Sequence, residues 1–381
     1  MRVFHIITTI NRGGAENHLK DLIADQIRQG GIDVSCAYLK GDAYWAEALT
    51  GMGCQVHALE MGRYGQLAPA WRLRKLIKAF APDVVHAHLA PAELYTRLAL
   101  LGDTSTPLVI SRHNHNRFYG GFGAEQVERW VVSRAQRFIG ISESVMRHFS
   151  KSIPEIADRF EVVPYGINAE PVASVSRSQA LQLRNEWGIG ADTVLLGTVA
   201  RLVPVKALHT LLEGYARLRV QSSSLDIKLV LVGAGPLEAD LKARAVSLGL
   251  GDSVVWAGFR QDIPIVMNAI DVFVLTSLSE GFGLVLLEAM SASKPVISTN
   301  VSALPEIVIE GETGLMVPPE NTAALASAIQ GLVQDAGMRE RFGKAGFERA
   351  VSNFSLDAMF KKTVKIYEQV LQQRKIQAGG R

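Results

Sequence analysis

Cysteine is scarce in this sequence, with only Cys36 and Cys54 among 381 residues. Two cysteines without the spacing of a zinc site predict reduced, buried thiols and no disulfide framework. Aromatic residues are also few, at 7%, whereas glycine occurs 34 times. This balance is typical of soluble α/β proteins, in which glycine turns connect strands to helices.

Long hydrophobic runs are missing as well. No apolar stretch approaches the roughly 20 residues that a membrane-spanning helix needs. The N-terminal MRVFHIITTI has neither the long apolar core nor the small-residue cleavage site of a signal peptide, so we interpret it as a first buried strand. Together with the two thiols, these features predict a cytoplasmic protein.

Neither sign of charge dominates the chain, since 40 Lys and Arg residues face 37 Asp and Glu residues. Up to Asn168 there are 19 basic and 16 acidic residues, and beyond it there are 21 of each. Eight of the nine histidines also lie before Asn168. An asymmetry this small does not indicate nucleic-acid binding, but it points any anionic partner toward the N-terminal half.

Short apolar runs alternate with helical patterns along the chain, at residues 3–10, 33–39, 83–88, 107–113, 193–200, 227–233, 253–258, 271–277 and 294–299. This alternation predicts doubly wound parallel sheets. Because 381 residues exceed one core, we expect two Rossmann-like α/β domains, residues 1–168 and 169–355, facing each other across a cleft. The final helix, at about 356–381, is expected to pack back onto the first domain.

The segment SEGFGLVLLEAM, residues 279–290, places two carboxylates around a glycine turn. We expect Glu280 in a loop after a strand and Glu288 two turns into the following helix, roughly 12 Å further along a helix axis. The N-terminus of that helix offers a phosphate the backbone amides of Gly281, Phe282, Gly283 and Leu284. The layout suits a sugar nucleotide, although an ordinary turn with two solvated glutamates would read the same way.

Two further segments follow strands where such a ligand would lie. ARLVPVK carries Arg201 and Lys206, whose charges suit a diphosphate unless they are only surface cations. INRGGAEN carries Gly13 and Gly14, which allow close approach of an anion or of the other domain. VGAGPLE adds a lone G-x-G ending at Gly235, which is a weak signal by itself.

Together these motifs resemble the retaining glycosyltransferases of family four, which have the GT-B fold of two facing Rossmann-like domains. The resemblance spans nearly the whole chain, from GGAEN and DVVHAH through VPYGIN and ARLVPVK to SEGFGLVLLEAM and ETGLMVPPEN. It implies that Glu280 binds the donor sugar and Glu288 the ribose, with VGAGPLE near the nucleoside. It also implies that Arg201 and Lys206 hold the diphosphate and that His113 contacts the sugar beside the reacting centre. The implied catalytic set is therefore His113, Glu280, Arg201 and Lys206.

The sequence departs from the family pattern at several turns. Tyr165 and Asn168 stand where the boundary turn usually has asparagine and aspartate, Ala207 replaces a glycine after the lysine, and Ser302 and Ala303 replace a glycine pair. None of these changes removes a carboxylate or a cation from the expected donor site. They leave the hinge conformation and the identity of the accepted sugar open.

The acceptor side is expected to use the loop around RHNHNRFYGGFG and the end of the strand DVVHAH. His86 and His88 share one face of that strand, and we interpret them as a hydrogen-bonded pair near the acceptor pocket and not as a metal site. The loop is either mobile and functional or simply exposed. The acceptor-side candidates are His86, His88, His115, Arg117 and Tyr119. The D-x-D signature of metal-dependent transferases is absent from the sequence, so neither a metal ion nor a cofactor is expected.

The segment LAPAWRLRKLIKAF, residues 67–80, is amphipathic. Its apolar face is expected to pack on the first sheet, and no acidic residue occurs between Met61 and Pro82. A tryptophan among cations is typical of a surface that rests on anionic lipid, formed here by Trp71, Arg72, Arg74, Lys75 and Lys78. The sequence therefore predicts peripheral contact with the inner face of the cytoplasmic membrane.

These features predict a metal-independent retaining glycosyltransferase that moves a hexosyl or N-acetylhexosaminyl group from a nucleotide diphosphate sugar, with UDP favoured. The expected acceptor is a lipid-linked saccharide or a precursor of a surface polysaccharide or lipopolysaccharide, and a soluble acceptor is the alternative. A sugar-nucleotide epimerase of the same architecture would need no acceptor. A further alternative is a regulator that binds the sugar nucleotide at the same site but transfers no sugar. The donor base and sugar, the linkage and the oligomeric state stay open.

Overall fold

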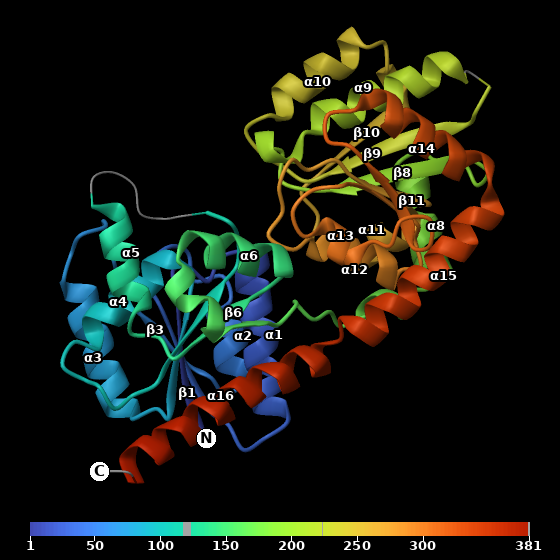
Figure 1. The fold of residues 1–381 in the computed structure, drawn as a ribbon. Helices are drawn as coiled ribbons and strands as arrows, with labels where there is room; N and C mark the ends of the chain where they lie inside the picture. The colour runs from blue at the N-terminus through green and yellow to red at the C-terminus, as the bar shows by residue number, and fades with distance from the viewer. Residues whose placement is uncertain (117–122, 223, 380–381) are drawn as a thin grey trace. The chain divides into compact units, whose positions relative to one another are not determined.

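A computed structural model describes residues 1–116, 123–222 and 224–379 (Figure 1). The chain divides into two compact units. Unit 1 comprises Met1–Gly166 together with Leu356–Arg381, and unit 2 comprises Ile167–Ser355. The division lies within two residues of the boundary expected near Asn168, and each unit is an α/β structure of its own.

Unit 1 is built on a parallel sheet with the strand order β3-β2-β1-β4-β5-β6-β7. The strands are β1 (Arg2–Ile7), β2 (Asp33–Tyr38), β3 (Gln55–Ala58), β4 (Val84–His88), β5 (Leu108–Arg112), β6 (Arg137–Gly140) and β7 (Phe160–Val162). The central strands are buried on both faces, as parallel sheets covered by helices are. The strand order changes direction between β1 and β4, and this switch point is where doubly wound sheets bind ligands.

The helices of unit 1 cover both faces of its sheet. They are α1 (Gly14–Arg28), α2 (Ala46–Gly51), α3 (Ala68–Phe80), α4 (Ala90–Ala99), α5 (Ala124–Val132), α6 (Glu143–Ser152) and α16 (Leu356–Gly379), with a 3-10 turn η1 (Pro154–Arg159). The final helix α16 packs against α1 and contributes Ile366 and Tyr367 to the core around Val3 and Val84 (Figure 1). The chain therefore ends by completing the unit in which it begins.

Unit 2 repeats the same winding with the order β10-β9-β8-β11-β12-β13. Its strands are β8 (Val194–Val199), β9 (Ile227–Val232), β10 (Val254–Gly258), β11 (Val272–Leu275), β12 (Val296–Thr299) and β13 (Gly314–Val317). All of their pairings are parallel. The switch point of this sheet lies between β8 and β11.

The helices of unit 2 begin at residues suited to the position. Ser176 forms a capping box with Gln179, and the side chains of Asn321 and Asp335 cap α14 and α15. The helices are α7 (Glu170–Ala173), α8 (Arg177–Glu186), α9 (Leu208–Gln221), α10 (Glu238–Ser247), α11 (Ile263–Ala269), α12 (Leu284–Ser291), α13 (Leu304–Ile307), α14 (Thr322–Gln334) and α15 (Ala336–Asn353), with 3-10 turns η2 (Pro204–Lys206) and η3 (Gly251–Ser253).

Every apolar run singled out in the sequence contains a strand, whereas β3, β6, β7 and β13 are short strands that the apolar runs did not mark. Both cysteines are free and buried, as expected. Within the described residues no helix is long and apolar enough to span a bilayer.

The packing of α16 yields a first prediction. Ile366→Ala should lower the free energy of unfolding by about 2 to 5 kcal/mol, because the side chain is fully buried and the substitution leaves a cavity. Ile376→Ala is the control, since Ile376 lies on the same helix but is 68% exposed. Urea unfolding of both variants measures the difference, and equal midpoints would show that α16 does not contribute to the core of unit 1.

Candidate functional site

Lys206 and Glu280 meet at the switch point of unit 2, where β8 and β11 end. The ammonium of Lys206 lies 2.5 Å from Oε1 of Glu280, and the Ser277 hydroxyl donates to the same oxygen at 2.6 Å. Thr276, just after β11, donates to the backbone carbonyl of Lys206 at 3.0 Å. The two expected donor-site residues are therefore held together by the strand ends that carry them.

The loop after Glu280 ends at Gly283, whose φ of +113° favours glycine. A Cβ atom there would lie 2.8 Å from Cδ2 of Leu304. Helix α12 starts at Leu284, so Glu288 is its fifth residue and lies just over one turn into it. The expectation of two turns was wrong because the glycine turn takes up the first half of the spacing, and the helical estimate of roughly 12 Å does not apply.

Phe282 packs its side chain inside unit 2. Its side chain is buried and its ring centroid lies 5.8 Å from that of Phe354. Only its backbone is therefore available to a ligand, and the side chain contributes to packing. Glu288 is half-buried on the helix that follows.

The loop that carries Arg201 rests on the glycine turn after β9. Leu202 N donates to the carbonyl of Ala234, and a Cβ atom at Gly235 would lie 2.5 Å from Leu202 O. Gly235 is required because two backbones touch, which a lone G-x-G in the sequence does not reveal. The Arg201 side chain is exposed and makes no hydrogen bond or ion pair with the described residues. It lies in the same short loop as Lys206.

Two departures from the family pattern retain the backbone conformation of glycine. Ala207 has φ +44° and Ser302 has φ +50°, so both adopt the left-handed region although neither is glycine. Both positions therefore have a backbone conformation that glycine adopts at lower cost than alanine or serine.

A cavity of about 320 Å³ lies in unit 1 at the switch point between β1 and β4. It is lined by residues at the end of β5 and by residues that follow β1, β4 and β5, namely Thr8, Thr9, Leu89, Ala90, Pro91, Glu93, Ser111, Arg112, His113, Asn114 and Asn116. His113 follows β5 directly, as the strand pattern predicts, and is 7% exposed. This is the position at which a doubly wound sheet binds a ligand.

A chain of hydrogen bonds runs inward from His113. Its Nε2 lies 3.1 Å from Nδ1 of His88, and Nε2 of His88 lies 3.0 Å from Nδ1 of His5. Nε2 of His5 lies 2.9 Å from Oε1 of Gln26, and Nδ1 of His113 lies 2.6 Å from the Tyr165 hydroxyl. All five residues are buried.

His86 belongs to a second branch of the same cluster. Its ring nitrogens lie 2.7 Å from the Tyr367 hydroxyl and 2.7 Å from the Ser111 hydroxyl. The rings of His86 and His88 are tilted by 39° with their centroids 4.0 Å apart, and they do not bond to each other. The expected hydrogen bond between the two histidines was therefore wrong, because both rings are fully buried and bonded to other groups. Their place near an acceptor pocket stays a prediction.

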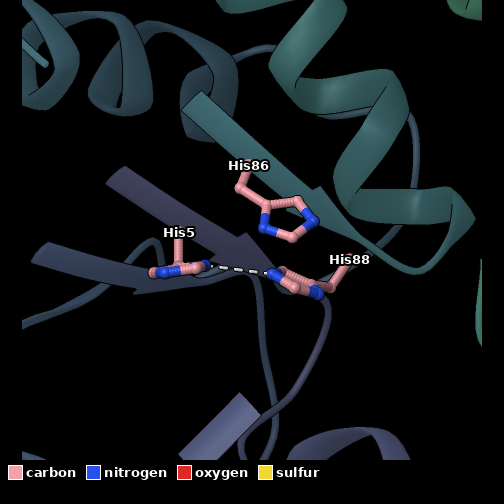
Figure 2. A group of neighbouring side chains, drawn as sticks. All are labelled: His5, His86 and His88. Carbon is pink, nitrogen blue, oxygen red and sulfur yellow. Dashed lines mark hydrogen bonds between the residues drawn. The ribbon is translucent and has the colours of Figure 1, made fainter. Parts of the chain in front are cut away.

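Three of these imidazoles are close enough to share a metal ion. His5, His86 and His88 bring ligand atoms within 4.8 Å of one another, the one such group in the described part of the chain (Figure 2). Each of their six ring nitrogens already has a hydrogen-bond partner. A cation there would have to break these bonds, so the arrangement fits a hydrogen-bonded cluster better than a metal centre.

Burial keeps the cluster neutral. It lowers the pKa of His5 to about 4 and that of His113 to about 3. It also lowers the pKa values of His86 and His88 well below the ordinary value, and neighbouring histidines add to this effect. At neutral pH each ring therefore carries one proton and one lone pair.

The remaining candidates on the acceptor side differ in placement. His115 lies 2.9 Å from the Ser144 hydroxyl and is part-buried, which lowers its pKa. Arg117 and Tyr119 lie outside the described residues. Gly13 and Gly14 start α1, where Gly13 has extended backbone that any residue adopts and lies beside the Glu16 carboxylate.

Sequence reasoning missed a buried ionic group at the cavity. The guanidinium of Arg112 lies 2.9 Å from Glu93 and 3.5 Å from Glu128, and its carbon lies 4.3 Å from the ring centroid of Phe149. Burial raises the pKa of Glu93 to about 7, although Arg112 opposes the shift. Of the missed residues, His5 and Arg112 carry a signal in the sequence, since each is a polar residue within an apolar run. Glu93 and Glu128 lie in α4 and α5 and carry no such signal.

The cations of α3 are less free than the sequence suggests. Arg72 donates to the carbonyl of Leu59 at 2.8 Å and pairs with Glu60. Arg74 donates to the carbonyls of Ala99 and Leu101. The expectation of four available cations was therefore wrong for these two, because neighbouring carbonyls and the Glu60 carboxylate lie within their reach.

Trp71 and Lys75 form the exposed part of the α3 surface. Trp71 is 59% exposed, and the ammonium of Lys75 lies 3.5 Å from the centroid of its ring. Lys78 is exposed on the same helix. Exposed aromatic and cationic side chains thus lie together on α3.

The lowered histidine pKa values predict how stability depends on pH. An unfolded histidine binds a proton near pH 6.5, whereas folded His5 resists protonation until about pH 4. The unfolded state therefore binds more protons in this window, and stability falls as the pH is lowered, by up to about 1.4 kcal/mol per pH unit for each such histidine. The midpoint of thermal unfolding should decrease from pH 7.5 to 5.5.

His5→Gln should make this slope shallower, whereas His209→Gln should not, because His209 is exposed. The raised pKa of Glu93 acts in the opposite direction, so the slopes of the variants are compared with that of the parent. Identical slopes in the parent and His5→Gln would contradict the neutral, buried state of the cluster.

Two family models match the chain. Glycosyltransferase Family 4 matches residues 12–171, and Glycosyl transferases group 1 matches residues 180–349. The chain is 26% identical over 388 residues to alpha-maltose-1-phosphate synthase of Mycolicibacterium smegmatis, covering 94% of this chain and 96% of that protein. It is 34% identical over 169 residues to the lipopolysaccharide core biosynthesis glycosyltransferase LpsE of Rhizobium meliloti, covering 44% and 48%.

The fold is shared with solved structures. HepE of Anabaena, crystallised in complex with UDP and glucose, superposes with a TM-score of 0.83 at 22% identity, covering 95% of this chain and 98% of HepE. The two family models together account for most of the chain, and the paired Rossmann-like sheets are those of GT-B enzymes. This protein is therefore a glycosyltransferase of group 1, a member of glycosyltransferase family 4 with the GT-B fold.

Proposed function

We propose that this protein is a retaining glycosyltransferase that moves a hexosyl or N-acetylhexosaminyl group from a UDP-sugar, without a metal ion, to a lipid-linked saccharide or a surface polysaccharide precursor. The observation that carries the donor half is the Lys206–Glu280 pair at the β8/β11 switch point. HepE, which shares the fold, binds UDP and glucose. LpsE, named for lipopolysaccharide core biosynthesis, supports the acceptor class.

In this proposal Lys206 and Glu280 exchange partners when the donor binds. In the structure the two side chains form an ion pair and are 16% and 15% exposed. A UDP-sugar brings two negative charges for Lys206 and Arg201, and sugar hydroxyls that donate to Glu280. Both cations then stabilise the charge that develops on the departing diphosphate, the role that a metal ion plays in other transferases.

The remaining donor contacts follow from the same loop. Glu288, one turn into α12, is assigned to the ribose hydroxyls, and the backbone at the start of α12 faces the diphosphate. His113 of unit 1 is assigned to the donor sugar beside the acceptor. An acceptor-dependent release of UDP tests transfer directly, because an epimerase of the same fold would release none.

Removing either cation should impair transfer. Lys206→Ala and Arg201→Ala should each cost about 2 to 4 kcal/mol of transition-state stabilisation, as the loss of a charge-stabilising donor does in a dry site. Lys242→Ala is the control, since Lys242 is an exposed cation of the same unit. The rate of UDP release is measured with the best donor from a panel of UDP-sugars, and near-normal rates in both variants would overturn the diphosphate assignment.

Substitutions of the two glutamates should have different effects on binding of the nucleotide and of the sugar. Glu288→Ala should weaken binding of UDP and of the UDP-sugar alike. Glu280→Ala should weaken only the UDP-sugar, and UDP should bind as well as before or more tightly because Lys206 loses its competing partner. Isothermal titration with both ligands measures this, and an equal loss of UDP affinity in the two variants would refute the assignment.

We also propose that the exposed part of α3, Trp71 with Lys75 and Lys78, contacts anionic lipid on the inner face of the cytoplasmic membrane. Each cation near such a surface contributes about 1 kcal/mol, so the double change Lys75→Gln and Lys78→Gln should weaken binding roughly 30-fold. Arg72 and Arg74 are left intact, because they hold neighbouring carbonyls.

Sedimentation with vesicles that contain anionic lipid measures this binding, and it should weaken as salt rises. The double change Lys242→Gln and Arg244→Gln is the control, because it removes two exposed charges from unit 2. If both double variants sediment like the parent, the exposed α3 surface has no role at the membrane and a soluble acceptor becomes the better hypothesis.

A further inference from the structure

Three buried imidazoles form a linear chain of hydrogen bonds between Gln26 and Tyr165, and the His86 branch joins it through the contact of Gln26 with Tyr367. The links are Gln26–His5 at 2.9 Å, His5–His88 at 3.0 Å, His88–His113 at 3.1 Å and His113–Tyr165 at 2.6 Å. Each ring uses one nitrogen toward each neighbour. Each neutral ring has one donor and one acceptor nitrogen. Once the proton of one ring is assigned to a nitrogen, the protons of the other rings are therefore assigned as well.

The amide of Gln26 sets the direction. Its oxygen faces His5 while its nitrogen donates to the Tyr367 hydroxyl at 3.5 Å, so Nε2 of His5 carries the proton. Because the ring is neutral, Nδ1 of His5 accepts, and His88 must donate to it from Nε2. His113 then donates from Nε2 to Nδ1 of His88, and the Tyr165 hydroxyl donates to Nδ1 of His113. A mixed arrangement would leave two protons or two lone pairs facing each other.

The chain cannot act as a proton relay. It leads from His113 on the cavity wall to the Gln26 amide, which is fully buried and does not take up a proton at physiological pH. The amide therefore does not pass a proton from His5 on to Tyr367, although its nitrogen donates to the Tyr367 hydroxyl. What the chain can do is hold each ring in one tautomer and one orientation, as an outer hydrogen-bond partner does for a functional histidine.

We propose that His5 and His88 are positioning residues that hold His113 as the neutral tautomer with its proton on Nε2. In this structure the Nδ1 lone pair of His113 accepts the hydrogen bond of the Tyr165 hydroxyl. In the proposal a hydroxyl of the sugar replaces Tyr165 as the donor to Nδ1. The role of His113 at the sugar rests on the proposed function, whereas its tautomer does not. The inference extends the site inward to two residues that never touch the substrate.

The groups that face His113 come from three parts of unit 1. His88 of β4 bonds to it, His18 of α1 lies 5.5 Å away between ring centroids, and Tyr165 holds Nδ1. The Glu16 carboxylate of α1 acts on Tyr165. Among the interactions that the structure describes, the Nε2 proton of His113 is accepted by His88 alone.

The second branch supplies a matched control. His86 lies two residues before His88 on the same strand and is as fully buried, but its nitrogens bond to Tyr367 and Ser111. His86→Phe and His88→Phe therefore remove equivalent imidazoles from one cluster. Only the second substitution cuts the chain to His113.

The experiment is a long-range proton–nitrogen NMR spectrum of the full chain with ¹⁵N-labelled histidine at pH 7, with the His113 signals assigned by His113→Gln. In the parent, His113 should show a protonated Nε2 and an unprotonated Nδ1. In His88→Phe the buried Nε2 proton loses its acceptor, so the proton should move to Nδ1 and donate to Tyr165. In His86→Phe the His113 signals should stay as in the parent.

Gln26→Met is a second variant that interrupts the chain, for the case that His88→Phe does not fold. It removes the amide that sets the direction of the chain, so His113 should give the signals of both tautomers. The proposal would be overturned if the His113 signals stayed unchanged in His88→Phe, or in Gln26→Met where only that variant folds. It would also be overturned if His113 of the unchanged protein carried its proton on Nδ1. Stoichiometric zinc in the purified protein, with histidine signals that change when EDTA removes it, would overturn it in favour of a metal centre at His5, His86 and His88. UDP affinity is measured in every variant, so a failure of the proposed donor site appears separately.

Discussion

Both sheets of this protein are parallel and covered on both faces, and this constraint decides where its chemistry can lie. A strand buried on both faces has no exposed side chain along its length, so polar groups meet a ligand only where strands end. In each unit the strand order reverses once, between β1 and β4 and between β8 and β11, and the loops there diverge. The cavity of unit 1 and the Lys206–Glu280 pair of unit 2 lie at these two points.

The histidine cluster is an exception, because it places polar side chains inside strands that are buried on both faces. His5, His86 and Ser111 are polar residues inside buried strands, and an unpaired polar group there would cost several kcal/mol. The cost is offset because each ring nitrogen finds a partner on a neighbouring strand or on α1 or α16. The pairing is complete only while the rings stay neutral, which links the cluster to pH.

Backbone contacts play a comparable part in unit 2. The loop with Arg201 and Lys206 keeps its path because Gly235 lets two backbones touch and Ala207 adopts a left-handed conformation. Helix α12 starts where Gly283 permits a turn against Leu304. The loops that carry Lys206 and Glu280 are thus shaped by close backbone contacts and by left-handed residues.

The sequence by itself determined the sheet type, the near-central boundary, the places of Glu280 and Lys206 after strands and the family, because alternating apolar runs and short motifs depend on local spacing. It did not determine the length of the turn before α12 or the partners of Arg72 and Arg74, since these depend on what folds back beside them. Only the tertiary structure placed Tyr367 against His86, 281 residues away in the chain, and joined His5 to His88 across the first sheet. Hydrogen bonds over such separations have no periodicity, so packing alone decides them.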